Sequence, residues 1–88
     1  MNVGTRVVVE KGCRAYGIDK GCRAVVKAVE PLGPDYSHNV AVTLFMLSGF
    51  NSGKTFRLHA RHMNRLSDPV VNLSALRPEH TVKVRVVQ

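Results

Sequence analysis

Gly53, Lys54 and Thr55 match the end of a phosphate-binding loop, in which backbone N–H groups and a lysine surround the phosphates of a nucleotide. The pattern also needs a glycine at position 48, but that residue is Ser48, and Gly49 lies one place late. A chain of 88 residues cannot hold the strands and helices that such a loop serves. We therefore interpret the segment SGFNSGK as a tight hairpin turn and not as a nucleotide site.

Two cysteines and two neighbouring histidines are the next residues that could do chemistry. Cys13 and Cys22 lack the Cys-x-x-Cys spacing of zinc sites, but they flank one loop, so a disulfide between them is geometrically possible. We expect two reduced thiols in a cytoplasmic chain and leave the pairing open. His59 and His62 could add two ligands for zinc, but the intervals match no familiar module. We expect no metal site and no cofactor.

The acidic residues do not form a catalytic set. All six Asp and Glu residues lie at strand ends, beside prolines or in a glycine-rich loop. Acid–base and nucleophilic catalysis need titratable groups that converge in one pocket, and neither paired carboxylates nor a Ser/His/Asp motif is visible. We therefore expect no catalytic residues and no enzyme activity.

Basic residues give the strongest functional signal. Thirteen Lys and Arg face six Asp and Glu, which gives a net charge of +7 and a pI near 10.1, and no acid occurs between Tyr36 and Ser67. Such an excess favours an anionic partner, usually nucleic acid; the alternative is a basic, solvated surface without a partner. Phosphate contacts position a protein without reading sequence. We expect them from Arg14, Lys20, Arg23, Lys27, Lys54, Arg57 and Arg61.

The elements that position these residues are predicted to be strands. Alternation of apolar and polar residues predicts strands at 6–10, 22–30, 54–59 and 81–88, with a short one at 70–73. On the second of these, Cys22, Ala24, Val26 and Ala28 are expected to share one face. The longest apolar run, VAVTLFML at 40–47, predicts a strand covered on both faces.

The segment after this hairpin fits two interpretations. Phe56, Ala60 and Met63 have helical spacing, so a helix over about 55–66 competes with a strand. Thr55, Phe56 and the two histidines are mediocre helix formers. We prefer a strand to His59, one 3₁₀ turn at 60–63 and a short strand at 64–66.

Length and composition indicate one small globular domain. Hydrophobic residues make up 44% of the chain and charged residues 22%. No apolar stretch is long enough to span a bilayer, and the first residues lack the apolar region of a signal peptide. We expect a cytoplasmic protein without a membrane partner.

The segments GTRVVVEKG and DKGCRAVVKAV resemble the KOW motif, an apolar strand, a turn with Lys-Gly and a second strand. Lys20 and Gly21 stand at the motif's Lys-Gly, whereas Ala24 stands where it has a characteristic glycine. The segment KTFRLHARHMNRLS is similar to the end of the SH3-like barrels that carry this motif in ribosomal proteins and bacterial transcription elongation factors. The resemblance implies an SH3-like barrel whose first loop, around residues 14–20, faces RNA or protein.

Tyr16 lies in that loop between Arg14 and Lys20. An exposed tyrosine there would stack on an unpaired base, whereas one folded back would cover the barrel mouth. The sequence leaves both alternatives open, and we include Tyr16 among the expected nucleic-acid-binding residues.

These inferences combine into one prediction. We expect an all-β, SH3-like barrel of about five strands over residues 1–67, with a C-terminal extension strand in 68–88 packed on the same domain. The expected function is nucleic-acid binding, RNA before DNA. The alternative is a protein-interaction or self-assembly module in which TVKVRVV (Thr81–Val87) pairs with another chain and forms a homo-oligomer.

Overall fold

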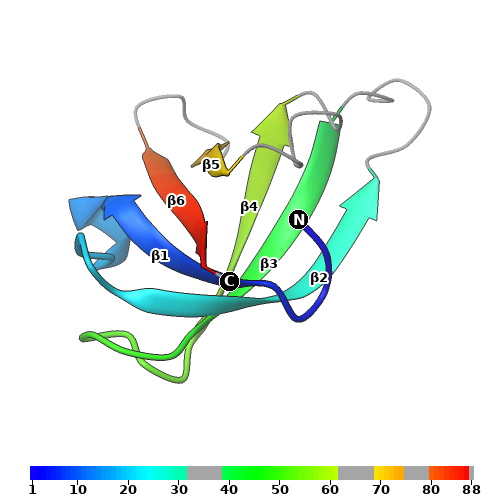
Figure 1. Cartoon of the computed structure of the whole chain (residues 1–88). Coiled ribbons are helices and arrows are strands. Elements are labelled where there is room, and N and C mark those ends of the chain that lie inside the picture. The colour runs from blue at the N-terminus through cyan, green and yellow to red at the C-terminus, as the bar shows by residue number, and fades with distance from the viewer. Residues whose placement is uncertain (32–38, 62–68, 75–79, 88) are drawn as a thin grey trace.

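The chain folds into a closed antiparallel barrel in which each strand pairs with the next and the last pairs with the first (Figure 1). The computed structural model describes residues 1–31, 39–61, 69–74 and 80–87. The strands are β1 (Arg6–Lys11), β2 (Arg23–Pro31), β3 (Asn39–Met46), β4 (Thr55–Arg61), β5 (Val70–Ser74) and β6 (Thr81–Val87), and a 3₁₀ helix, η1 (Arg14–Tyr16), follows β1. The all-β prediction is confirmed, with six strands in the barrel instead of about five.

Alternating valines fill the barrel interior. Val7 and Val9 on β1 and Val82 and Val84 on β6 are at most 1% exposed, whereas Val8 between the first pair is half-buried and Lys83 between the second pair is exposed. A strand points successive side chains to opposite faces, so this alternation places one face inside. Burial of each valine contributes about 1.5–3 kcal/mol, which drives closure of the sheet.

The C-terminal strand β6 is an integral strand of the barrel. Val84 pairs with Val9 on β1 and with Val71 on β5, so β6 is hydrogen-bonded along both sides. The segment 68–88, expected to be an extension, therefore contributes two barrel strands. Thr81–Val87 was expected to pair with another chain because a terminal strand would have a free edge, but β6 has no free edge. Homo-oligomer formation therefore stays a prediction, and a free edge of β6 no longer supports it.

Two expectations about strand faces need correction. In β2 the register shifts between Val26 and Ala28, so Lys27 forms a bulge and Ala28 is half-buried instead of joining the inner face. In β3 the inner face is buried, but Thr43 and Phe45 on the outer face are only half-buried. The strand is thus not fully covered on both faces.

The strand expected up to His59 is confirmed, and as β4 it continues to Arg61. The competing helix is wrong over residues 55–61. The 3₁₀ turn is wrong at Ala60 and Arg61, because Ala60 continues the strand opposite Val40 and is buried. The rest of that turn and the strand at 64–66 lie outside the described residues. The short strand expected at 70–73 is present as β5.

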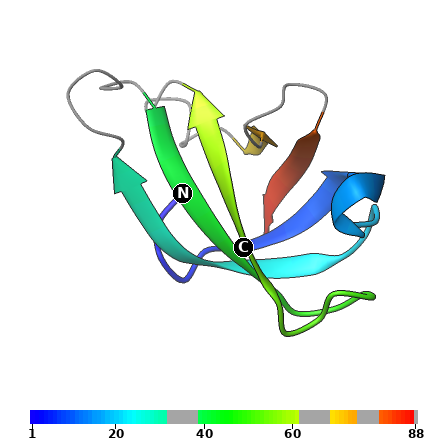
Figure 2. The same cartoon turned by 180° about the vertical axis from the view of Figure 1, so that it is seen from behind.

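Two loops meet at one end of the barrel, the β1–β2 connection with η1 and the β3–β4 turn (Figures 1 and 2). Asn51, only 7% exposed, joins them: its amide donates hydrogen bonds to the carbonyl oxygens of Tyr16 (2.6 Å) and Gly17 (3.1 Å). We call residues 12–22 and 47–54 together the loop end. The segment that resembled a nucleotide loop is the hairpin turn between β3 and β4.

Candidate nucleic-acid interface

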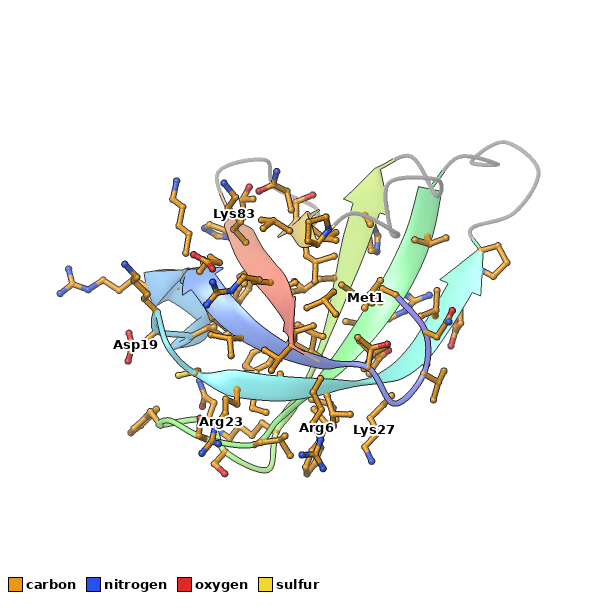
Figure 3. The ribbon with its side chains drawn as sticks, in the orientation of Figure 1. Met1, Arg6, Asp19, Arg23, Lys27 and Lys83 are labelled. Atoms are coloured by element: carbon orange, nitrogen blue, oxygen red, sulfur yellow. The ribbon has the colours of Figure 1, made fainter. Side chains whose placement is uncertain are left out.

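Three exposed cations project from the same side of β1 and β2: Arg6, Arg23 and Lys27 (Figure 3). Their positions follow from the register, because Arg6 lies opposite Val25, and Arg23 and Lys27 flank Val25 on β2. Diagonal neighbours across an antiparallel pair are about 7–8 Å apart, within reach of long side chains. We call Arg6, Arg23 and Lys27, with Val25 and Phe45 between and beside them, the basic face.

Phe45 of β3 completes the apolar centre of this face. It lies opposite Val25, and the Nζ of Lys27 lies 5.2 Å from the centroid of its ring. A cation over an aromatic ring gains about 0.5–1 kcal/mol at an exposed site. The contact therefore favours a defined position for Lys27 and leaves its ammonium charge facing outward.

The basic face has no carboxylate partner within the described part of the chain. The ion pairs among the described residues involve other arginines: Arg57 pairs with Glu30 (3.5 Å) and Arg85 pairs with Glu10 (2.8 Å). Among the described residues, no ion pair therefore neutralises the charges of Arg6, Arg23 and Lys27.

Two further arginines lie on the outer surface next to this face. Arg85 of β6 was not among the expected residues; it lies opposite Val8, which is also opposite Arg23. Arg57, which was expected, lies opposite Thr43 and pairs with Glu30. Both ion pairs are partly exposed, and exposed pairs contribute at most about 1 kcal/mol, so a phosphate can compete with the carboxylate for either arginine.

The remaining expected cations lie at the loop end or outside the described side chains. Arg14, Lys20 and Lys54 are exposed at the loop end. Arg61 ends β4, and its side chain lies outside the described residues. The expected set therefore divides into Arg23 and Lys27 on the basic face, the loop-end group, and Arg57 on β4. Sequence reasoning missed Arg6, although its alternation with Val7 and Val9 gave its outward direction.

Tyr16 is folded back toward the barrel. It is half-buried against the core, and its ring centroid lies 5.9 Å from that of Phe56 and 5.4 Å from that of His80. Aromatic pairs of this geometry contribute about 0.5–1.5 kcal/mol each beyond their buried area. Of the two alternatives for Tyr16, the structure shows the one in which the ring covers the barrel mouth.

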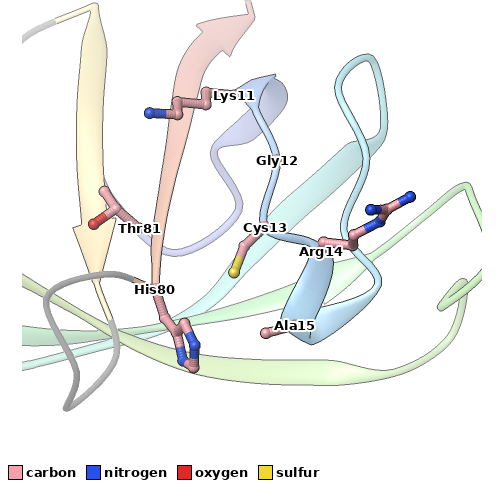
Figure 4. A pocket seen from close by; sticks show the side chains of 7 residues that line it. All are labelled: Lys11, Gly12, Cys13, Arg14, Ala15, His80 and Thr81. Carbon is pink, nitrogen blue, oxygen red and sulfur yellow. The ribbon is translucent and has the colours of Figure 1, made fainter.

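A pocket of about 500 Å³ lies beside η1, lined by residues 11–15, His80 and Thr81 (Figure 4). Lys11 and Arg14 extend from opposite sides of it and point away from each other. Cys13 and His80 are the described lining residues that could act as nucleophile and base, and the described lining includes no carboxylate to orient the histidine. The described part of the lining therefore contains a thiol and an imidazole without an orienting carboxylate.

The two cysteines are free thiols, each 8% exposed, so the structure shows the reduced alternative. Among the described residues, no three His, Cys, Asp or Glu side chains gather as metal ligands. His62 lies outside that part of the chain, so the absence of a metal site stays a prediction. The described ranges also hold no helix with the length and hydropathy needed to cross a membrane.

Comparisons with protein-family models, curated proteins and solved structures found no match. The class of the protein is therefore stated from its own geometry: a six-stranded antiparallel barrel with a basic outer face on β1 and β2.

Proposed function

We propose that this chain binds nucleic acid through phosphate contacts made by the basic face, with RNA preferred because of the resemblance to the KOW motif. The observation that carries the proposal is the cluster of Arg6, Arg23 and Lys27 on one side of the barrel without a carboxylate partner among the described residues. An excess of positive charge concentrated on one face is the electrostatic footprint of a nucleic-acid-binding domain.

The dimensions of the face fit a polyanion better than a single small anion. Arg23 and Lys27 are four residues apart on β2, which corresponds to about 13 Å at about 3.3 Å per residue. Phosphates of a duplex strand repeat every ~3.4 Å along the axis, so the face spans several of them. Between the cations, Val25 and Phe45 offer no hydrogen-bonding group, so the face gives affinity and orientation without reading base edges.

The test compares two double variants that each lower the net charge from +7 to +5. One is Arg6→Gln with Arg23→Gln on the basic face. The matched control is Lys11→Gln with Lys83→Gln; these lysines lie opposite each other on β1 and β6, and Lys83 projects from another side of the barrel (Figure 3). Affinity for mixed-sequence RNA and DNA is measured by fluorescence anisotropy from about 20 mM to about 300 mM salt.

Two phosphate contacts fewer should lower the slope of log K against log salt by about 1.4 for single strands and 1.8 for duplexes. Extrapolated from a 1 M reference, this is roughly a 25-fold to 60-fold loss of affinity at 0.1 M salt. The control pair should lose far less. Equal losses in both variants would mean that net charge, not the basic face, governs binding, and no binding by the natural sequence at low salt would refute the proposal.

A further inference from the structure

The β3–β4 turn holds an exposed aromatic ring. Phe50 is 89% exposed, more than the other exposed large hydrophobic residues of the described chain, of which Val3 at 65% is the next. A phenylalanine this exposed gives no hydrophobic stabilisation to the fold, since nearly all of its apolar surface stays in water. Its side chain is therefore free to make contacts outside the molecule.

The backbone of this turn is tightly defined. Gly53 N donates to Met46 O (2.8 Å), Ser52 N to Gly49 O (3.1 Å) and Lys54 N to Asn51 O (3.0 Å). Gly49 and Gly53 have φ of +89° and +87°, a conformation that favours glycine. The turn thus positions Phe50 on a hydrogen-bonded frame.

The residue after Phe50 anchors this frame to the rest of the loop end. The buried amide of Asn51 donates to Tyr16 and Gly17, as described above. The Phe50 ring borders Gly17 as well, because its Cδ1 lies 3.8 Å from where a Cβ on Gly17 would be. The ring therefore has a defined neighbour at one edge while its faces remain open to solvent.

The turn also begins beside the basic face. Leu47 N donates to Arg23 O (2.8 Å), and Arg23 N donates to Ser48 Oγ (2.9 Å). Lys54 at the end of the turn is exposed, and the turn 47–54 contains no Asp or Glu. A nucleic-acid strand whose phosphates contact Arg23 would thus run next to the turn that holds Phe50.

We propose that Phe50 stacks on an unpaired base of a single-stranded nucleic acid held by the basic face, an inference that rests on the proposed function. The occupant that fits these surroundings is a polyanion with flat apolar groups, because the turn that carries the ring begins at contacts with Arg23 and ends at the exposed Lys54, and the ring is 89% exposed. Base–aromatic stacking tolerates every base, since each base has a π-face, so Phe50 confers preference for single strands without sequence specificity.

The experiment uses Phe50→Ala, Phe50→Trp and, as a control of similar chemistry in the same turn, Leu47→Ala, whose residue is 44% exposed. Each full-length variant is titrated with a single-stranded RNA and with a duplex long enough for its ends to contribute little. Because the chain has no tryptophan, Phe50→Trp places a single indole at the contact, and stacking on a base should quench its emission.

Phe50→Ala should weaken single-strand binding by about 5-fold to 150-fold, the range for loss of one base–aromatic stack. Duplex affinity and the salt slope should stay unchanged, Phe50→Trp should restore binding with quenching, and Leu47→Ala should bind like the natural sequence. These results together support the proposal.

Other outcomes refute it and separate it from the proposed function. If the natural sequence binds RNA but Phe50→Ala binds equally well, or loses duplex and single-strand affinity alike, stacking is refuted and the phosphate contacts stand. If light scattering shows self-association that Phe50→Ala abolishes, the ring contacts a second copy instead of a base. If the natural sequence binds no nucleic acid at low salt, both proposals fail.

Discussion

Asn51 should stabilise the loop end through the two hydrogen bonds that its side chain donates. In Asn51→Ala the carbonyl oxygens of Tyr16 and Gly17 lose these donors at 2.6 and 3.1 Å. A typical hydrogen bond contributes about 0.5–1.5 kcal/mol net, so the variant should lose about 1–3 kcal/mol of unfolding free energy. For a domain of this size, 2 kcal/mol corresponds to roughly 8–16 °C in Tm.

A second variant, Asn51→Asp, separates hydrogen bonding from packing because it keeps the shape of the side chain. At pH 7 the introduced carboxylate has no proton to donate and faces two carbonyl oxygens, so the loss should exceed that of Asn51→Ala. The same surroundings raise the pKa of the introduced carboxyl above its unfolded value of about 3.9. The protonated form therefore stabilises the variant below about pH 4, and this contribution is lost as the pH rises through the folded pKa.

The assay is urea denaturation followed by circular dichroism at several pH values, with Ser52→Ala as the control. Ser52 is exposed, and its hydroxyl donates at 3.3 Å to Leu47 O, so its removal should change the unfolding free energy by less than about 0.5 kcal/mol. If both Asn51 variants unfold within that margin of the natural sequence, or if the two behave alike across pH, the two loops are not held together by this amide.

Two further predictions concern stability. Gly12→Ala should lower the unfolding free energy by about 1–3 kcal/mol, because a Cβ would overlap the backbone oxygen of Ile18. Thermal denaturation measures this loss, and an unchanged Tm would contradict the packing of this loop. Arg57→Gln should change the unfolding free energy by less than about 1 kcal/mol, because the ion pair of Arg57 with Glu30 is 3.5 Å long and both side chains are exposed. A loss above about 2 kcal/mol in urea denaturation would show instead that the pair stabilises the fold.

Short-range alternation predicted the strands well because it reports which face of a strand is buried. Val7 and Val9, and Val82 and Val84, are inside as their spacing predicts. What alternation lacks is register. The bulge at Lys27 and the continuation of β4 through Ala60 depend on which residues of β3 lie opposite, and that pairing is settled by the whole barrel.

Closure of the barrel also could not be predicted from alternation, because it depends on the pairing of distant strands. The chain-terminal pattern TVKVRVV predicts a strand, but whether that strand is an edge or closes the sheet depends on pairs such as Val9 with Val84, which are 75 residues apart in sequence. The last strand was therefore predicted as an extension of a barrel of about five strands, whereas it is one of the six that close the barrel.

The candidate site was partly predictable for a related reason. The outward direction of Arg23 and Lys27 follows from their own strand, whereas the grouping with Arg6 needs the pairing of β1 with β2. The folded-back Tyr16 depends on two rings, Phe56 and His80, from distant segments. Phe50, however, could have been identified from the sequence, because it is a large apolar residue in the centre of a turn rich in Gly, Asn and Ser.

The register of β1 and β2 also explains how the fold tolerates the basic face. Like charges directly opposite each other on neighbouring strands are destabilising. Here Arg6 lies opposite Val25 and Arg23 lies opposite Val8, so each guanidinium has a valine across the strand pair and a cation only at the diagonal. The repulsion is thus reduced although, among the described residues, no carboxylate pairs with Arg6, Arg23 or Lys27. A surface built in this way stays positively charged, and the salt dependence of binding tests whether a polyanion contacts it.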